Sequence, residues 1–269
     1  MVYEFILTRR EGPIEYLTLN RPEVRNTFNE QVVQELTAWA AAIEADKDVR
    51  VVVLAGAGSA FCAGADLRWM ARMAASSHEE SVRDATAVAT MYSAIDRLPV
   101  PLVGRVHGAA LGGGAGLAAV CDVVVAEEHA SFGFTEVKVG LLPAVVSPYV
   151  VAKIGVSAAR ELFLTGMRFD AARAKEIGLV HAVGAADEVD RRVSAYVKEI
   201  LSAAPGAVAA AKELLKQVAG QPARDLASLT AGALADRRSS AEGREGMRAF
   251  LDKRKARWNV SPDSDRQSR

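Results

Sequence analysis

The sequence holds two glycine-rich turns, SAFCAGADL at residues 59–67 and HGAALGGG at residues 107–114. Each turn follows a run of apolar residues, Val51–Ala55 before the first and Pro101–Val106 before the second, and each leads into a helical pattern. The first N–H groups of a helix have no partner inside that helix, and glycine lets the backbone approach closely. Two such turns can therefore bring two free amides together as an oxyanion hole. The same glycines also suit tight helix packing, and the spacing alone favours neither interpretation.

Outside the turns, short β-rich runs alternate with helical periodicity. A hairpin is predicted where Phe5–Thr8 and Ile14–Asn20 flank the turn residues Glu11-Gly12-Pro13. Apolar residues at helical spacing predict an amphipathic helix over Asn29–Ala45. Further elements are expected as strands at 51–55, 101–106 and 123–126 and as helices at 82–98 and 113–120. This alternation predicts an α/β layer fold with its functional loops at strand-to-helix turns.

Toward the C-terminus the strand signal disappears. Helices are predicted at 191–203, 207–218, 222–238 and 242–255, with glycine or proline at their borders. The sequence therefore predicts a core over residues 1–200 and a helical region over 201–258. The last stretch, 259–269, is rich in Ser, Asp and Arg, and we expect a frayed tail there.

Composition and charge exclude several classes of protein. The chain has 269 residues, with 33 Lys and Arg against 33 Asp and Glu. A net charge of zero lacks the basic surface that nucleic acid or an anionic membrane requires. The uncharged stretches at 108–121 and 139–152 have fourteen residues each, fewer than the ~18 that span a bilayer. The two cysteines, Cys62 and Cys121, form no metal or disulfide pattern, and the N-terminus lacks a signal-peptide pattern, so we expect reduced thiols and a cytoplasmic location.

Familiar catalytic motifs do not explain the sequence. The run GGGAGL at 112–117 ends in leucine, which departs from the dinucleotide-binding pattern. Phosphate-loop, serine-hydrolase and HExxH zinc motifs do not occur, and the four histidines show no metal-ligand spacing. We therefore expect no metal and no bound redox or nucleotide cofactor.

The residues around both turns resemble the crotonase (enoyl-CoA hydratase/isomerase) superfamily. The likeness extends over about residues 3–258, in order and at the separations of that family. The matching segments are NRP at 20–22, AFCAGADL at 60–67, HG at 107–108, LGGG at 111–114, CD at 121–122, FG at 132–133 with Glu136, LP at 142–143, TG at 165–166, GLV at 178–180 and FLDKR at 250–254.

The resemblance implies a fold, a site and an assembly. The fold would be a spiral of β-β-α repeats with a C-terminal helical region that builds homotrimers, or dimers of trimers. The backbone N–H groups of Ala65 and Gly113 would hold the thioester oxygen of an acyl-CoA, and coenzyme A would enter only as part of the substrate. The other substrate-binding positions that the resemblance implies are Arg25, Ala63, Gly64, Asp66, Leu67, Trp69, Met70, Gly112, Gly116 and Lys253.

The resemblance implies one acid-base residue where the hydratases have two. Glu136 occupies the position of the second glutamate, and Gly116 stands where the first is found. A single carboxylate can move a proton at the α-carbon, but something else must hold the attacking water. The segments GGGAGL, FTEVKVGLLP and SPYV are similar to bacterial hydratases of 3-methylglutaconyl-CoA and isohexenylglutaconyl-CoA. We therefore rank a hydratase of a branched or carboxylated 2-enoyl-CoA first.

Two alternatives stay open. A Δ3,Δ2-enoyl-CoA isomerase needs only one base, and a degenerate acyl-CoA-binding protein needs none. We also hypothesise that Gly116 leaves a void beside Glu136 that admits a distal carboxylate of the substrate. Arg68 or Arg72, one helical turn apart, would hold that carboxylate.

Overall fold

The computed structural model describes residues 3–259, and these form two compact units. The first unit contains the residues up to Leu98 and Leu102–Ser194, and the second contains Pro99–Pro101 and the residues from Ala195 onward. The boundary expected at residue 200 falls inside helix α7 (Ala186–Ser202). The tail expected at 259–269 lies, beyond Asn259, outside the described residues.

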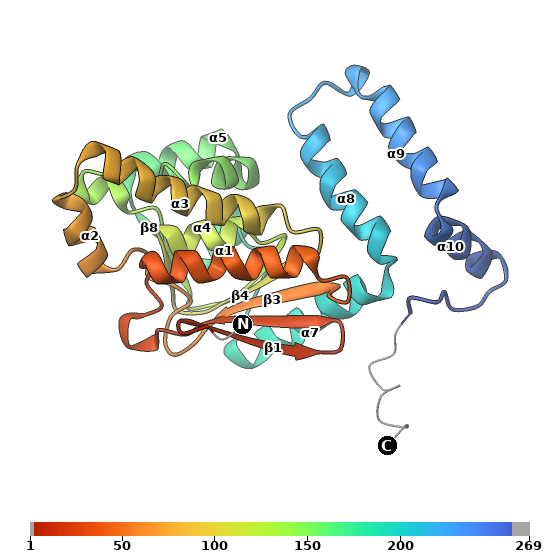
Figure 1. The fold of residues 1–269 in the computed structure, drawn as a ribbon, viewed down its shortest axis with the longest axis horizontal. Coiled ribbons are helices and arrows are strands. Elements are labelled where there is room, and N and C mark those ends of the chain that lie inside the picture. Colours follow the sequence, from red (N-terminus) through yellow and green to blue (C-terminus); the bar gives the residue numbers. More distant parts are fainter. Residues whose placement is uncertain (1–2, 260–269) are drawn as a thin grey trace. The chain divides into compact units, whose positions relative to one another are not determined.

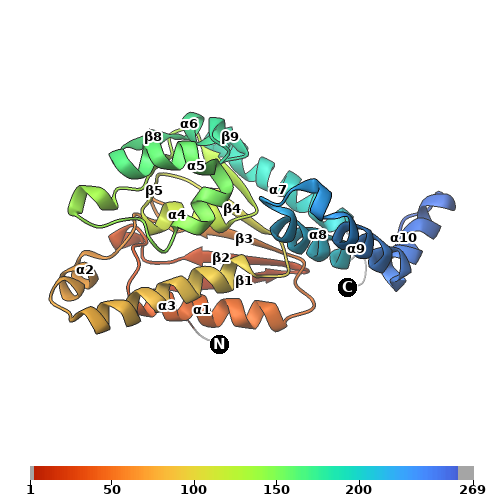
Figure 2. The ribbon, with the colours of Figure 1, turned by 90° about the horizontal axis from the view of Figure 1, so that it is seen from above.

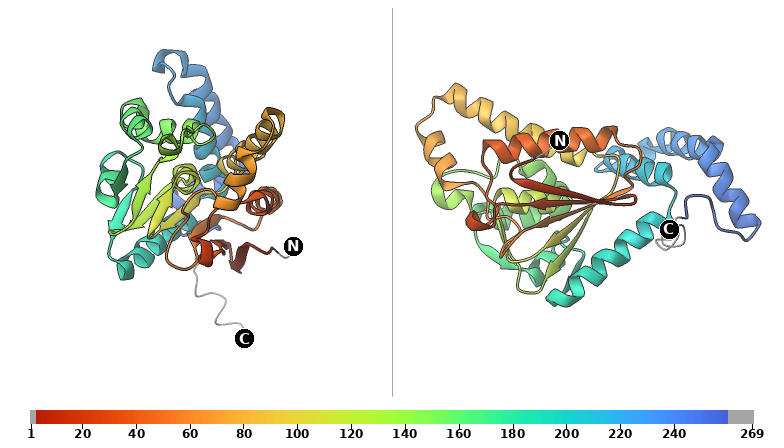
Figure 3. Two further views of the ribbon diagram at one scale, coloured as in Figure 1. Left: turned by 90° about the vertical axis from the view of Figure 1, so that its left-hand side faces the viewer. Right: turned by 60° about the horizontal axis from the view of Figure 1, so that its bottom comes forward.

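A six-stranded sheet organises the first unit, which has the expected α/β class. The strand order is β1-β2-β3-β4-β6-β9, with β1 and β2 antiparallel and the remaining neighbours parallel. The strands are β1 (Ile6–Glu11), β2 (Ile14–Leu19), β3 (Val51–Gly56), β4 (Leu102–Val106), β6 (Val123–Glu127) and β9 (Ala182–Gly184). The predicted hairpin is confirmed and lies at the edge of the sheet (Figure 3). Residues 51–54 of β3 are all buried, as expected of a parallel strand covered on both faces.

A second sheet is made of very short strands. It contains β5 (Ala109–Leu111), β7 (Ser131–Gly133) and β8 (Arg168–Asp170), in that order. Sequence periodicity predicted none of these strands, because three residues are too few to show an alternating pattern. β5 lies within the second glycine-rich turn, residues 107–114, and therefore helps to position it.

Helices cover the large sheet (Figures 1 and 2). They are α1 (Glu30–Ala45), α2 (Leu67–Ala74), α3 (His78–Asp96), α4 (Gly113–Val120), α5 (Ser147–Thr165) and α6 (Ala171–Glu176), with short 3-10 turns η1 (Pro22–Val24) and η2 (Glu136–Val139). α1 and α3 lie side by side over one face of the sheet. α3 begins four residues before the expected start, because Ser77 and Glu80 form a capping box there. Among the described residues, no helix combines the length and apolar character needed to cross a bilayer.

The second unit is helical, as the sequence predicts. After α7 it contains α8 (Pro205–Val218), η3 (Ala223–Asp225), α9 (Ala227–Ser239) and α10 (Ala241–Leu251). α8 and α9 run antiparallel beside each other (Figure 1). The carboxylate of Glu242 accepts hydrogen bonds from the amides of Gly206 and Ala207, at 3.1 and 2.9 Å, in the first turn of α8. An acidic side chain at this position satisfies amides that have no partner within the helix.

Candidate active site

The two glycine-rich turns are joined by backbone hydrogen bonds. The amide of Cys62 donates to the carbonyl of Ala109 at 3.0 Å, and the amide of Leu111 donates to the carbonyl of Cys62 at 3.0 Å. These bonds form a parallel bridge between Cys62 and Ala110. The segment after β3 therefore lies against the segment after β4 in one fixed register.

Gly114 makes this approach possible. A Cβ atom at residue 114 would lie 2.1 Å from the carbonyl oxygen of Cys62 and 2.9 Å from its carbonyl carbon. Backbone atoms cannot move aside as the end of a flexible side chain can. A glycine is thus required where α4 begins against the first turn.

The amides of Ala65 and Gly113 are free to bind a ligand. The neighbours of Ala65 pair with Phe28, because Phe28 N–H donates to Gly64 O and Asp66 N–H donates to Phe28 O, both at 2.8 Å. In such a parallel bridge, the N–H of Ala65 itself points away from Phe28. Gly113 is the first residue of α4, so its N–H has no intrahelical partner. Within residues 3–259, neither amide donates to a backbone carbonyl.

Glu136 lines the same cavity as these two residues. The cavity has a volume of about 320 Å³ and is otherwise mostly apolar. Its lining consists of Phe28, Ala65, Trp69, Asp84, Ala85, Val88, Tyr92, Gly113, Glu136 and the loop 141–146. Oε2 of Glu136 is buried and accepts no hydrogen bond from the described residues. Burial raises the pKa of Glu136, since the charged form loses solvation. A carboxylate of this kind is suited to accept a proton from a ligand in the cavity.

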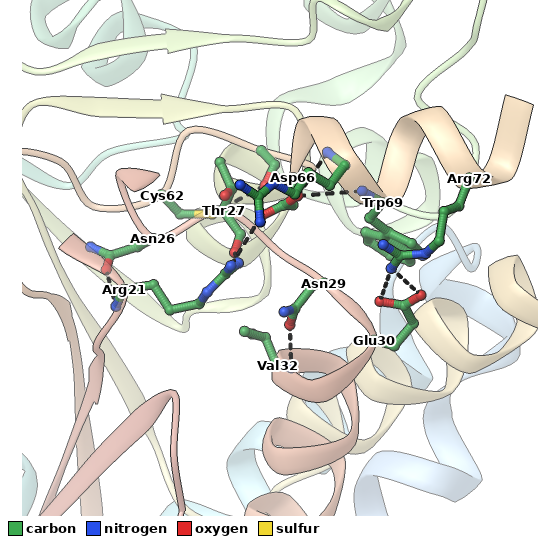
Figure 4. A network of polar contacts seen from close by, with 12 residues as sticks. Arg21, Asn26, Thr27, Asn29, Glu30, Val32, Cys62, Asp66, Trp69 and Arg72 are labelled. Atoms are coloured by element: carbon green, nitrogen blue, oxygen red, sulfur yellow. Dashed lines mark hydrogen bonds and ion pairs between the residues drawn. The ribbon is translucent and has the colours of Figure 1, made fainter. Parts of the chain in front are cut away.

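A second cavity, of about 680 Å³, shares Ala65 with the first. Its lining contains Arg21, Glu23, Val24, Arg25, Thr27, Ala63, Ala65, Asp66, Leu67 and Arg68. Asp66 caps α2 by accepting from the amides of Arg68 and Trp69, and Arg21 Nη2 donates to its other carboxylate oxygen at 3.0 Å (Figure 4). Burial opposes ionisation of Asp66, but these hydrogen bonds outweigh it and lower the pKa. The cap holds the backbone on the C-terminal side of Ala65.

Comparison with known proteins identifies the family. A family model described as enoyl-CoA hydratase/isomerase matches residues 9–261. The chain belongs to this family.

Related proteins cover nearly the whole chain. An enoyl-CoA hydratase homologue of Thermus thermophilus is 38% identical over 248 residues, which is 92% of this chain and 98% of that protein. The crystal structure of an enoyl-CoA hydratase from Shewanella pealeana has a TM-score of 0.91 at 34% identity and covers 95% of this chain and 96% of its own. The structure of Pseudomonas aeruginosa AtuE has a TM-score of 0.91 at 39% identity and covers 96% of this chain and 100% of its own. As a member of the enoyl-CoA hydratase/isomerase family, the chain is an enzyme.

Tyr92 is one residue of this hydratase/isomerase site that the sequence did not reveal. It is fully buried in α3, and its hydroxyl donates to the carbonyl of Gly113 at 2.6 Å. The ring contacts those of Phe28 and Tyr149, with centroid separations of 6.5 and 5.8 Å. The sequence shows Tyr92 only as one apolar position of an amphipathic helix, so its contact with Gly113 carries no local signal.

The space beside Gly116 is occupied, so the expected void is wrong. A Cβ atom at residue 116 would lie 2.3 Å from Cγ1 of Val146 and 3.0 Å from the hydroxyl oxygen of Tyr92. Val146 immediately precedes α5, and Tyr92 comes from α3. These two side chains fill the space into which a side chain at 116 would extend.

We predict that Gly116→Glu fails to restore a second catalytic carboxylate. The new side chain overpacks against Val146, which typically costs about 1–3 kcal/mol, and buries a charge as well. Thermal unfolding should show a lower midpoint, and hydration of 2-enoyl-CoA substrates should not increase. Adding Val146→Ala should recover part of the lost stability, because it removes the nearest colliding atom. A single variant with wild-type stability and faster hydration would contradict this prediction.

The structure also changes the expected roles of the two arginines on α2. Arg72 is paired with Glu30, with Nη2 2.5 and 2.7 Å from the two carboxylate oxygens (Figure 4). Arg68 lines the second cavity, beside Asp66, rather than the cavity of Glu136. The expectation that Arg72 holds a distal carboxylate is therefore wrong, and Arg68 does not line the space where that carboxylate was expected.

The hydrophobic side of α2 faces a third cavity. Trp69 and Met70 line this space of about 480 Å³ together with Met73. Trp69 is only 7% exposed, and its Nε1 donates to Asp84 at 3.0 Å. Burial raises the pKa of Asp84. Trp69 and Asp84 line both this cavity and that of Glu136.

The remaining predicted positions differ in how directly they could touch a ligand. Gly64 and Gly112 contribute backbone to the turns, and a Cβ at residue 112 would lie 3.2 Å from Oε1 of Glu136. Arg25, Ala63 and Leu67 line the second cavity. Lys253 belongs to the second unit, and its contact with coenzyme A stays a prediction.

Proposed function

We propose that the enzyme adds water to the double bond of a 2-enoyl-CoA thioester or removes it in the reverse direction. The observation that carries this proposal is the common cavity of Glu136 and the free amides of Ala65 and Gly113. Two amides can bind the thioester oxygen more strongly as it becomes an enolate oxygen, and one such donor contributes about 10²- to 10³-fold to rate in other enzymes.

A single carboxylate is sufficient for the proton transfers. Ionised Glu136 accepts a proton from water while the water oxygen bonds to C3 of the acyl chain. The C2–C3 π electrons then form an enolate whose oxygen accepts from Ala65 and Gly113. As the enolate collapses, the protonated Glu136 returns that proton to C2. The sum of these steps is addition of H and OH across one double bond, with the enzyme unchanged.

Coenzyme A is proposed to follow the second cavity. Ala65 lines both spaces, so a thioester held at its amide has the acyl chain on one side and the pantetheine on the other. Arg21, Arg25 and Arg68 line the second space, where phosphate groups would find positive charge. No cofactor beyond coenzyme A is required by these steps.

We further propose a branched acyl group, with 3-methylglutaconyl-CoA as the first substrate to test. The support is the pairing of Gly116 with the Thr135-Glu136-Val137 and Ser147–Val150 segments. A distal carboxylate would meet Asp84 in the cavity, and no Lys or Arg of the described residues lines that space. Neutral 3-methylcrotonyl-CoA is therefore the matched comparison, because it keeps the branch and lacks the charge.

The deciding experiment measures kcat/KM for 3-methylglutaconyl-CoA, 3-methylcrotonyl-CoA and crotonyl-CoA from the loss of the conjugated thioester absorbance. Faster turnover of both branched substrates than of crotonyl-CoA supports a branched acyl group in the natural substrate. Preference for the glutaconyl ester over its neutral analogue supports a distal carboxylate in that substrate, and the reverse preference excludes one. Binding of these esters without hydration of any of them would contradict the proposed hydratase function.

Isomerisation is the second candidate, because Gly116 leaves the site with one carboxylate at the α-carbon. The same base could carry a proton between C2 and C4 of a 3-enoyl-CoA. Rapid conversion of a 3-enoyl-CoA to its 2-enoyl isomer, with no water uptake from any substrate, would favour this reaction over hydration.

We propose that the chain forms a homotrimer or a dimer of trimers in the cytoplasm. Phe250 and Leu251 of α10 are 83% and 78% exposed in the single chain, and Met247 is also exposed. An exposed apolar patch of this kind is typical of an interface. Both cysteines are buried and form no disulfide within the described residues, which fits a reducing compartment. Burial raises the pKa of Cys62 to about 12. Light scattering should report three or six copies at micromolar concentration, and a monomer would contradict the assembly.

A further inference from the structure

Hydration with one carboxylate leaves the attacking water short of a hydrogen-bond acceptor. A water molecule directs a lone pair at carbon most effectively when both of its hydrogens are engaged. Glu136 can accept one of them, and Asp84, the other carboxylate that lines this cavity, already accepts from Nε1 of Trp69 at 3.0 Å. Where the first glutamate of a two-carboxylate hydratase would begin, a Cβ atom on Gly116 would lie 3.0 Å from the hydroxyl oxygen of Tyr92. The phenol oxygen therefore lies beside the point from which the missing glutamate side chain would extend.

The hydrogen bonds of Tyr92 fix what its oxygen can do. A phenol has one proton to donate, and Tyr92 donates it to the carbonyl of Gly113 at 2.6 Å. Any further partner must therefore donate to Tyr92. Because Tyr92 lines the same cavity as Glu136, such a donor can be a water molecule between them.

We propose that Tyr92 holds the attacking water by accepting one of its hydrogens, while Glu136 accepts the other. This inference rests on the proposed hydratase function and names the residue that replaces the missing carboxylate. The water oxygen then has a lone pair directed toward C3 of an acyl chain whose thioester oxygen lies at the Ala65 and Gly113 amides.

The protonation state of Tyr92 agrees with a holding role rather than that of a base. Burial, together with the negative charges that Cys62, Glu136 and Tyr149 would carry, raises its pKa well above the ordinary value. The phenol stays neutral, so the proton of the water goes to Glu136 and returns from there to C2. After the addition, the hydrogen bond that Tyr92 accepted from the water is replaced by one from the product hydroxyl at C3.

A purely structural role is the rival explanation. The Tyr92 hydroxyl also supports the carbonyl of Gly113, whose amide belongs to the proposed oxyanion hole. Loss of that support would weaken every reaction that passes through the enolate. Loss of a water-holding contact would weaken only the reaction that consumes water.

The test compares two reactions in Tyr92→Phe and in the matched control Tyr149→Phe. The ring of Tyr149 packs beside that of Tyr92, with centroids 5.8 Å apart, but Tyr149 does not line the cavity. The first reaction is hydration of the best 2-enoyl-CoA substrate. The second is exchange of the C2 hydrogens of butyryl-CoA with D₂O, which needs Glu136 and the oxyanion hole but no attack by water.

The expected result is a loss of hydration by about 10- to 100-fold in Tyr92→Phe, with C2 exchange within about threefold of wild type and Tyr149→Phe near wild type in both. Equal losses in the two reactions, or unchanged hydration, would overturn the proposal.

If Tyr92→Phe does not fold, 3-fluorotyrosine at position 92 keeps the donated bond and weakens the oxygen as an acceptor. A smaller loss confined to hydration is then expected, and no loss overturns the proposal. A wild-type enzyme that hydrates no 2-enoyl-CoA would instead remove the proposed function itself.

Discussion

Replacing Glu136 with glutamine is expected to lower kcat for hydration by about 10²- to 10⁴-fold, the usual cost of losing a general acid-base group. The amide has nearly the same shape but cannot take a proton from water and return it to C2. The free amides of Ala65 and Gly113 remain, so the Kd for a saturated acyl-CoA, measured by calorimetry, should stay within a few-fold of wild type. A loss in kcat without a matching loss in binding identifies the proton-transfer step.

The pH profile provides an independent check of the same residue. Glu136 must be ionised to accept the proton from water, so kcat/KM should rise with pH as this carboxyl loses its proton. Burial raises the pKa of Glu136, and the acidic limb should therefore lie above the range of an ordinary carboxyl. Glu136→Gln should lack this limb in its residual activity.

Glu128→Gln serves as the matched control for Glu136→Gln. Glu128 is exposed and does not line the cavity, so the same chemical change there should leave kcat and the pH profile unaltered. If Glu136→Gln hydrates as fast as wild type, another group performs the proton transfer and the proposed mechanism is wrong.

Local patterns were sufficient to predict the main elements of the first unit. The Gly12 turn between two β-rich runs predicts the β1–β2 hairpin, and the uninterrupted apolar run of β3 predicts a strand buried on both faces. Asn29 is the first residue of the predicted helix, and in the structure it caps α1 by accepting from the amide of Val32. Each of these signals depends on residues close together in the sequence.

The contents of the site depend on residues far apart in the sequence. Gly116 shows only that no side chain is attached there, and the sequence does not say whether the space is empty or filled. Val146, thirty positions later, and Tyr92, twenty-four positions earlier, fill it. The ion pair of Arg72 with Glu30 likewise joins α2 to α1. The sequence alone does not show that Arg72 has this partner, and it therefore suggested Arg72 as a ligand for a substrate carboxylate.

Replacing Gly114 with alanine is expected to disrupt both folding and catalysis. The added Cβ would lie 2.1 Å from the carbonyl oxygen of Cys62, the same oxygen that accepts from the amide of Leu111. Relief of this clash requires the two glycine-rich turns to separate. Ordinary overpacking costs about 1–3 kcal/mol of stability. The loss here should be at least as large, because backbone rather than a side chain must move.

The catalytic loss should exceed what reduced stability explains. Separation of the turns displaces the Gly113 amide relative to Ala65, and losing one oxyanion donor typically costs about 10²- to 10³-fold in kcat. The measurements are the thermal midpoint and kcat for hydration at a temperature where the variant is folded. Gly232→Ala is the matched control, because Gly232 also lies in a helix, α9, and has no atom within 4 Å of the added Cβ. That control should gain about 0.5–1 kcal/mol from helix propensity and keep full activity. Wild-type stability and kcat in Gly114→Ala would contradict this prediction. They would mean that the Cys62 carbonyl can move without cost and that catalysis does not depend on a fixed spacing of the Ala65 and Gly113 amides.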